Sequence, residues 1–131
     1  MWGWLRRGAL DILDKVRPHS DWIPEDLYAA LRNNTVVCFI VTRNQKALGW
    51  IAGEMQKDRY GKLEWFLWCA WDIPPAEREP GDDVDGAREQ LVEYVKIWAK
   101  GAGCRRITTL SARKLEYLGW TRGHTVYYLP L

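Results

Sequence analysis

The sequence predicts an α/β domain in which a mixed sheet surrounds a central β-α-β crossover and carries helices on both of its faces. Residues 63–71 form a run in which both sets of alternating side chains are largely apolar, as in a strand that is covered on both sides. Residues 86–100 then repeat apolar side chains at helical spacing, and residues 106–110 return as a strand. Such a β-α-β unit normally forms a parallel, right-handed crossover.

Two helices are expected before the sheet. Residues 5–16 place apolar side chains at helical spacing, and the proline at position 18 closes the segment. Pro24 suits the first turn of a second helix, and Asn33-Asn34 suits its end. Both segments are amphipathic, so each is expected to turn one apolar face inward.

The first two strands are expected to form a hairpin, and a third strand follows it. Residues 35–42 are a β-branched run, residues 43–46 are a polar turn, and residues 47–55 return as the second strand. A turn at 57–62 leads to the strand at 63–71. Because side chains alternate along a strand, one face of it is expected to carry Trp65, Leu67, Cys69 and Trp71.

One long loop precedes the strongest helix. Residues 72–85 contain three prolines, one glycine and many charges, which is typical of a loop. The helix at 86–100 carries its acids early and a lysine late, as the helix dipole prefers. After the strand at 106–110, we expect a short helix at 111–118 and a last strand at 123–129.

Composition indicates one soluble domain over residues 1–131. Nineteen basic and seventeen acidic residues leave a formal charge of +2, too small to indicate a nucleic-acid partner. No segment approaches the about 20 apolar residues of a membrane span, and the start lacks the apolar run of a signal peptide, so secretion is not expected. The three cysteines have no paired spacing, which predicts reduced thiols and no metal.

The order of these elements resembles the GNAT superfamily of N-acetyltransferases across nearly the whole chain. Residues 98–107 (WAKGAGCRRI) are similar to the end of that family's long helix and its next strand, and residues 115–120 (LEYLGW) are similar to its segment ending in Gly-Phe. The first of these segments also resembles small GNAT-like proteins encoded among tailed-bacteriophage virion genes. The resemblance implies an acetyltransferase fold and, in active members, acetyl-CoA as the cofactor.

In active members a loop of pattern Q/R-x-x-G-x-G/A and the following helix start hold the CoA pyrophosphate, because glycines let backbone amides approach phosphates. Two registers are open here. Residues 78–83 (REPGDD) supply Arg78 and Gly81, but Pro80 has no amide proton. Residues 83–88 (DVDGAR) supply Gly86, Ala87 and Arg88, but begin with an acid. The sequence therefore predicts a degenerate loop.

Charge points the same way. Residues 77–88 hold five acids against two arginines, a net charge of −3, and phosphates brought there would be repelled. The alternative interpretation is that acids near a helix start only stabilise the helix.

The catalytic positions implied by the resemblance are also altered. The family often uses a tyrosine four residues before the Gly-Phe glycine as the acid that reprotonates CoA, and this chain has Leu115 there. Tyr117 is the nearest substitute, but two helical residues turn it by roughly 200°. Glu64 or Asp72 could serve as general base through water if the pocket made its carboxylate basic enough, but the usual exposure of acidic residues favours the alternative, a solvated charge at a strand end.

Tryptophan is unusually frequent, with nine in the chain, so some are expected at interfaces. The segment 1–20 is a candidate docking element for a partner protein or a membrane surface. Its candidate contact residues are Trp2, Trp4, Leu5, Arg6 and Arg7. The alternative is that this segment folds back on its own domain.

Two functions follow from these observations. The first is a virion-associated structural or interaction protein, in the virion or the host cytoplasm, that has lost the cofactor site and binds proteins or itself. The second is an active N-acetyltransferase with an atypical loop. Acetyl-CoA binding separates the two.

Overall fold

The computed structural model describes residues 2–16, 24–109, 119–121 and 123. The short helix expected at 111–118 and the strand expected at 123–129 lie outside this part of the chain, apart from Gly123. The described elements are, in order, α1 (Trp2–Val16), α2 (Pro24–Arg32), β1 (Val37–Arg43), β2 (Lys46–Lys57), β3 (Leu63–Asp72), the 3-10 turn η1 (Pro75–Glu77), α3 (Val84–Gly101) and β4 (Arg106–Thr109).

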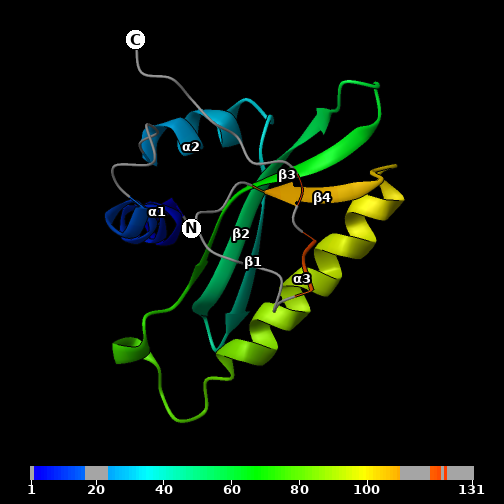
Figure 1. Cartoon of the computed structure of the whole chain (residues 1–131). Helices are drawn as coiled ribbons and strands as arrows, with labels where there is room; N and C mark the ends of the chain where they lie inside the picture. The colour runs from blue at the N-terminus through cyan, green and yellow to red at the C-terminus, as the bar shows by residue number, and fades with distance from the viewer. Residues whose placement is uncertain (1, 17–23, 110–118, 122, 124–131) are drawn as a thin grey trace.

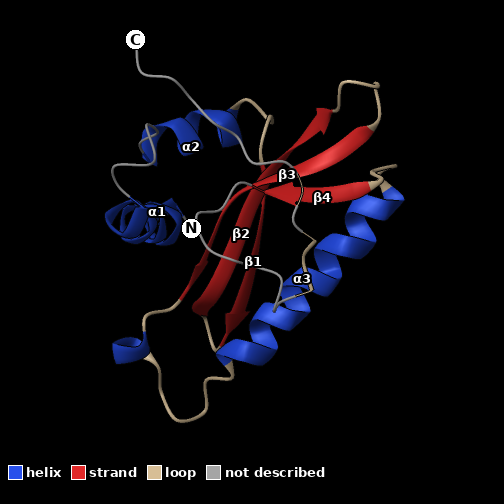
Figure 2. Ribbon diagram, viewed as in Figure 1, coloured by secondary structure: helices blue, strands red, loops and turns tan. Residues whose placement is uncertain are grey.

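These elements form a mixed four-stranded sheet in the order β1-β2-β3-β4 (Figure 1). Strands β1, β2 and β3 pair antiparallel, whereas β3 and β4 pair parallel and are joined through α3. Helices α1 and α2 lie on one side of the sheet and α3 on the other (Figure 2). The predicted fold class, with its central crossover and helices on both faces, is confirmed.

A bulge in β3 overturns the predicted uniform alternation. Ala52 pairs with Cys69 and Gly53 pairs with Leu67, so Trp68 is an extra residue in the ladder. Trp65 and Leu67 consequently pack in the cluster of buried residues on the α3 side, whereas Cys69 and Trp71 belong to the cluster under α1 and α2. The single extra residue turns the second half of the strand over and lets β3 supply both layers of core.

Helix α1 crosses the sheet directly over two buried tryptophans. A Cβ atom at Gly8 would lie 2.6 Å from Nε1 of Trp50 and 2.8 Å from Cγ of Trp71, so only glycine allows this approach. One turn further along, Trp71 Nε1 donates a hydrogen bond to Asp11, with 3.1 Å between Nε1 and Oδ2. The N-terminal helix is therefore part of the core layer.

Candidate functional site

The start of α3 is the place where the resemblance expects a pyrophosphate. Asp83 is the N-cap residue of α3, and its carboxylate accepts a hydrogen bond from the amide of Gly86, with 3.0 Å between Gly86 N and Asp83 Oδ1. A Cβ atom at Gly86 would lie only 2.1 Å from Asp83 Oδ2. The carboxylate thus lies against the first turn of the helix, and an anion already occupies the end that would attract one.

Two cations from distant parts of the chain neutralise the acidic loop. Arg7 of α1 forms an ion pair with Glu77, and Lys46 of β2 forms one with Asp82, with 2.6 Å between Nζ and Oδ2. Lys46 also donates to the backbone oxygen of Glu77 at 2.9 Å. With these two partners the net charge of −3 counted over residues 77–88 falls to −1. The repulsion expected from the sequence is correspondingly weaker.

These contacts shift the ionisation of the loop acids. The hydrogen bond from Arg7 lowers the pKa of Glu77. The pKa of Asp82 is lowered first by the backbone amide of Glu79, at 2.9 Å, and then by Lys46. Both carboxylates therefore stay charged, and they tie the loop to α1 and β2.

The other residues predicted to hold the cofactor are engaged in structural contacts. Arg78 donates from Nε to the backbone oxygen of Ile73 at 3.0 Å, and Ala87 is buried in the core. Arg88 donates from Nε to Asp72 Oδ2 at 3.0 Å and also contacts Asp85 at 3.5 Å. Gly81 lies in an exposed turn, with nothing within 4 Å of a Cβ placed there.

The two candidate general bases lie at opposite ends of β3. Eight residues separate Glu64 from Asp72, which in a strand corresponds to roughly 25 Å, so they cannot act on one group. Glu64 is buried and accepts a hydrogen bond from Arg106, with 2.5 Å between Nε and Oε1. Asp72 accepts a hydrogen bond from Arg88. Each carboxylate is engaged by a guanidinium group. Tyr117, the third catalytic candidate, lies outside the described residues.

Part of the β3 edge has no neighbouring strand among the described residues, a feature that the sequence did not predict. The pairing of β3 with β4 covers only Glu64–Leu67 against Arg106–Thr109. From Trp68 to Asp72, β3 pairs with no described strand on its β4 side. Free amides and carbonyls of this kind can bind an extended chain or ligand.

The N-terminal contact residues predicted from the sequence are divided between core and surface. Leu5 is buried in the core, which removes it from any docking surface, whereas Trp4 is exposed. Arg6 lies 3.6 Å from Glu25, and Arg7 pairs with Glu77. Trp2 is half-buried against Tyr28, with the ring centroids 5.0 Å apart.

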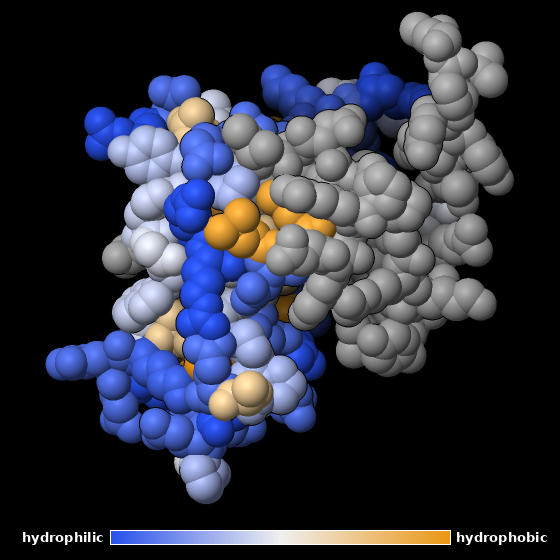
Figure 3. Space-filling model, turned by 90° about the vertical axis from the view of Figure 1, so that its left-hand side faces the viewer, coloured by the Kyte–Doolittle hydropathy of each residue, from blue (hydrophilic) through white to orange (hydrophobic). Residues whose placement is uncertain are grey.

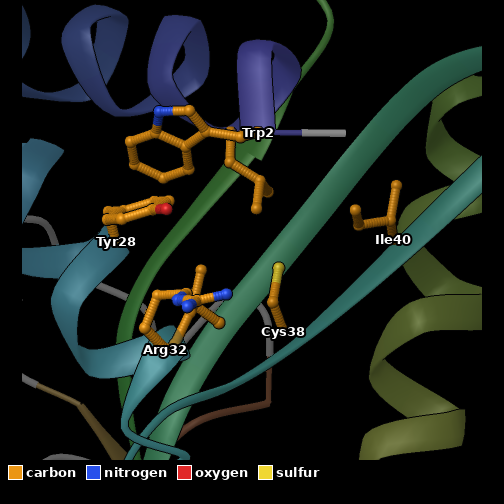
Figure 4. A pocket seen from close by; sticks show the side chains of 7 residues that line it. Trp2, Tyr28, Arg32, Cys38 and Ile40 are labelled. Carbon is orange, nitrogen blue, oxygen red and sulfur yellow. The ribbon is translucent and has the colours of Figure 1, made fainter.

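A shallow pocket of about 300 Å³ opens between α1, α2 and β1. Figure 4 shows the side chains that border it, with Trp2 and Tyr28 from the helices and Cys38 and Ile40 from β1. Arg32 at the end of α2 is the one cation among the described residues that line it. Burial raises the pKa of the Cys38 thiol to about 12, so this thiol is not a nucleophile at neutral pH. Sequence reasoning missed this pocket.

No helix among the described residues is long and apolar enough to cross a membrane. Nor does any group of three or more histidine, cysteine or acidic side chains within this part of the structure have an arrangement that could hold a metal ion.

Comparison of the sequence with protein-family models and with curated proteins finds no match. Among solved structures, a probable acetyltransferase is similar over 99% of this chain and 89% of its own, with a TM-score of 0.69 and 14% identity. The aminoglycoside N-acetyltransferase AAC(6')-Iy in complex with CoA has a TM-score of 0.61 and 18% identity, covering 81% of this chain and 83% of its own. An acetyltransferase of Trypanosoma brucei has a TM-score of 0.62 and 15% identity, covering 98% and 94%. These likenesses establish the GNAT acetyltransferase fold.

Proposed function

We propose that this chain is a GNAT-fold protein that has lost its cofactor site and serves as a structural or interaction protein. The observation that carries the proposal is the Asp83 carboxylate bound to the Gly86 amide at the start of α3. In this position the carboxylate takes the place that a pyrophosphate would need. The residues present therefore do not fit acetyl-CoA.

The energies favour the protein's own acid over a ligand phosphate. Replacing the cap would forfeit about 1 kcal/mol of helix stabilisation. A phosphate about 4 Å from the displaced carboxylate would add about 1 kcal/mol of repulsion, even in water. The helix dipole offers only about 0.3–1 kcal/mol in return. To bind CoA here, the chain would need cations that offset both the lost cap and the repulsion. Arg78 and Arg88 are the cations of this loop, and both already have other partners.

The contacts of the two candidate general bases on β3 support a function without catalysis. A general base must be free to accept a proton from the acceptor amine. Glu64 is buried beside Arg106, and Asp72 lies beside Arg88, so each has a structural partner.

The setting that we propose is a phage virion or the host cytoplasm, with other proteins as partners. It follows from the resemblance of residues 98–107 to virion-gene proteins and from the surplus of tryptophan. Exposed Trp4 and half-exposed Trp2 at the start of α1 are suited to such contacts, because aromatic side chains dominate protein interfaces.

An active N-acetyltransferase is the second candidate, and the fold favours it. The chain is similar to an acetyltransferase solved with CoA, and the open edge of β3 after Leu67 could bind an extended ligand. Acetyl-CoA would then be the cofactor. A substitution such as Gly86→Asp would be the simplest way to block CoA at the start of α3. It does not test this candidate cleanly, because a side chain there would also displace the Asp83 cap.

Calorimetric titration of CoA into the full chain tests the proposal. We expect no saturable binding at micromolar CoA, and no acetyl transfer to amines. A matched variant, Asp83→Ser, keeps a capping oxygen and removes the negative charge. It should bind CoA better than the parent does, since only the parent carries the competing carboxylate. Micromolar binding of CoA by the parent would overturn the proposed loss of the cofactor site, and acetyl transfer would establish the second candidate instead.

A further inference from the structure

Strand β1 is an open edge of the sheet within the described residues. It pairs only with β2, and β4 lies at the opposite edge (Figure 1). An edge strand presents amides and carbonyls that another strand can bind. Proteins normally guard such edges with lysine, proline or an inward-pointing charge.

The central residues of β1 carry none of these guards. Four consecutive residues, Cys38 to Val41, are apolar, and the only charged residue of the strand is Arg43 at its end. Phe39 packs on the α3 side against Trp65 and Trp98, whereas Cys38 and Ile40 belong to the α1 and α2 side. The strand is therefore held firmly on both faces while its outer edge stays open.

The pocket lies beside this edge. Among the described residues that line it, the strand residues are Cys38 and Ile40 of β1 (Figure 4). The pocket therefore lies over β1 and not over the middle of the sheet. A strand added next to β1 would place every second side chain on the same face as these two residues. One such side chain would meet Trp2 and Tyr28.

Charge indicates which side chains would fit there. Arg32 lines the pocket, is exposed, and has no ion pair with any described residue. None of the described residues that line the pocket is acidic. Figure 3 shows mainly hydrophilic residues and a small hydrophobic area where the described residues are drawn on the side of the molecule that lies at the left of Figure 1. Among the described residues, the pocket combines apolar side chains with the cation of Arg32. A second copy of the chain would bring no acid on its own β1 to meet Arg32.

We propose that β1 binds an extended segment of a partner protein as an added strand, with an apolar side chain in the pocket and an acidic side chain against Arg32. Main-chain hydrogen bonds would supply affinity, and the pocket would supply specificity. The inference rests on the proposed interaction role, and it names the surface and the kind of partner. It is independent of CoA, so either proposal can fail alone.

The inference is tested by selecting, from a library of random linear peptides, those that bind the full chain. Enriched peptides are expected to combine an acidic residue with large apolar residues. Their dissociation constant should rise about tenfold or more for Arg32→Glu. The control Arg59→Glu makes the same charge change in the exposed β2–β3 turn and should leave binding unchanged. Arg32→Gln provides a milder version, with a smaller loss expected.

Hydrogen exchange separates strand addition from mere pocket filling. Backbone amides of β1 should exchange more slowly with the peptide bound, because an added strand accepts hydrogen bonds from them. The proposal is overturned if no peptide is enriched, if binding is insensitive to Arg32→Glu, or if β1 exchange is unchanged. It is also overturned if the chain dimerises and Ile40→Lys makes it monomeric, because the edge then serves a second copy.

Discussion

The Asp83 carboxylate and the Gly86 amide are joined by a hydrogen bond of 3.0 Å at the first turn of α3. The same contact starts the helix and fills the position that the GNAT resemblance assigns to a phosphate. An aspartate that caps a helix stabilises it without help from a ligand. The first turn of α3 is therefore stabilised by the chain's own residues.

Removing the cap should destabilise the domain. Asp83→Ala is expected to lower the free energy of unfolding by about 1 kcal/mol, since the Gly86 amide loses its acceptor. Asp83→Ser retains an acceptor and should stay close to the parent. Urea unfolding of the three proteins measures the difference. Equal stability of Asp83→Ala and the parent would show that the cap contributes nothing.

The crossing of α1 over the sheet should tolerate no side chain at Gly8. Gly8→Ala places a Cβ 2.6 Å from Trp50 Nε1, and such overpacking costs about 1–3 kcal/mol. This cost outweighs the up to about 1 kcal/mol that alanine gains over glycine in a helix. Gly3→Ala is the matched control, because nothing lies within 4 Å of a Cβ there. Thermal unfolding should show a lower Tm for Gly8→Ala alone; a raised Tm in both variants would contradict the packing.

The contribution of Glu64 to stability should depend more on Arg106 than on Arg105. The Arg106 Nε lies 2.5 Å from Glu64 Oε1, whereas the Arg105 Nη2 lies 3.9 Å from it. Arg106→Ala leaves a buried carboxylate without its near partner, and we expect a loss of about 1–2 kcal/mol, reduced because Arg106 is half exposed. Arg105 also pairs with Asp58 at 3.4 Å, so the two arginines are compared in a Glu64→Gln background. There the cost of Arg106→Ala should shrink more than that of Arg105→Ala. Denaturation curves that give Arg105 the larger coupling to Glu64 would be incompatible with this geometry.

The ion pairs of the acidic loop should make stability depend on pH. The folded-state pKa of Asp82 lies below its usual value, through the Glu79 amide and Lys46. The carboxylate therefore contributes stability above its unfolded pKa of about 4, and this contribution disappears as the pH falls through the lowered value. Lys46→Met should lower Tm at pH 7, and the difference from the parent should shrink in acid.

Lys96→Met provides the control for that comparison, because Lys96 pairs with Glu93 on the exposed surface of α3. Its Tm should stay close to that of the parent at both pH values. A Tm difference between Lys46→Met and the parent that grows towards acid would be contrary to the lowered pKa.

Local sequence patterns were sufficient to predict the order of the helices and strands from α1 to β4. The apolar spacing of α1 and α3 and the polar turn between β1 and β2 are local signals, and all three elements form as expected. The observed boundaries of the elements differ from the predicted ones by a few residues. Helix α3 begins at Val84 rather than at Gly86, because Asp83 is its cap. An aspartate three residues before the predicted start was the signal that could have corrected this.

The bulge at Trp68 had no such signal. Where both faces of a strand are apolar, one extra residue changes no visible pattern, yet it moves Cys69 and Trp71 to the other face. The pairing of Glu77 with Arg7 joins positions 70 residues apart, and the pairing of Asp82 with Lys46 joins positions 36 apart. A charge count over a short window cannot include such partners.

The most direct test of the proposed loss of the cofactor site is to follow the amide resonance of Gly86 while CoA is added to isotopically labelled protein. If Asp83 holds this amide, the Gly86 signal should stay in place while CoA rises to excess, and the same titration of Asp83→Ser should move it. A saturable shift of the Gly86 signal in the parent protein would mean that a phosphate displaces the carboxylate, and the chain would then have a working CoA site.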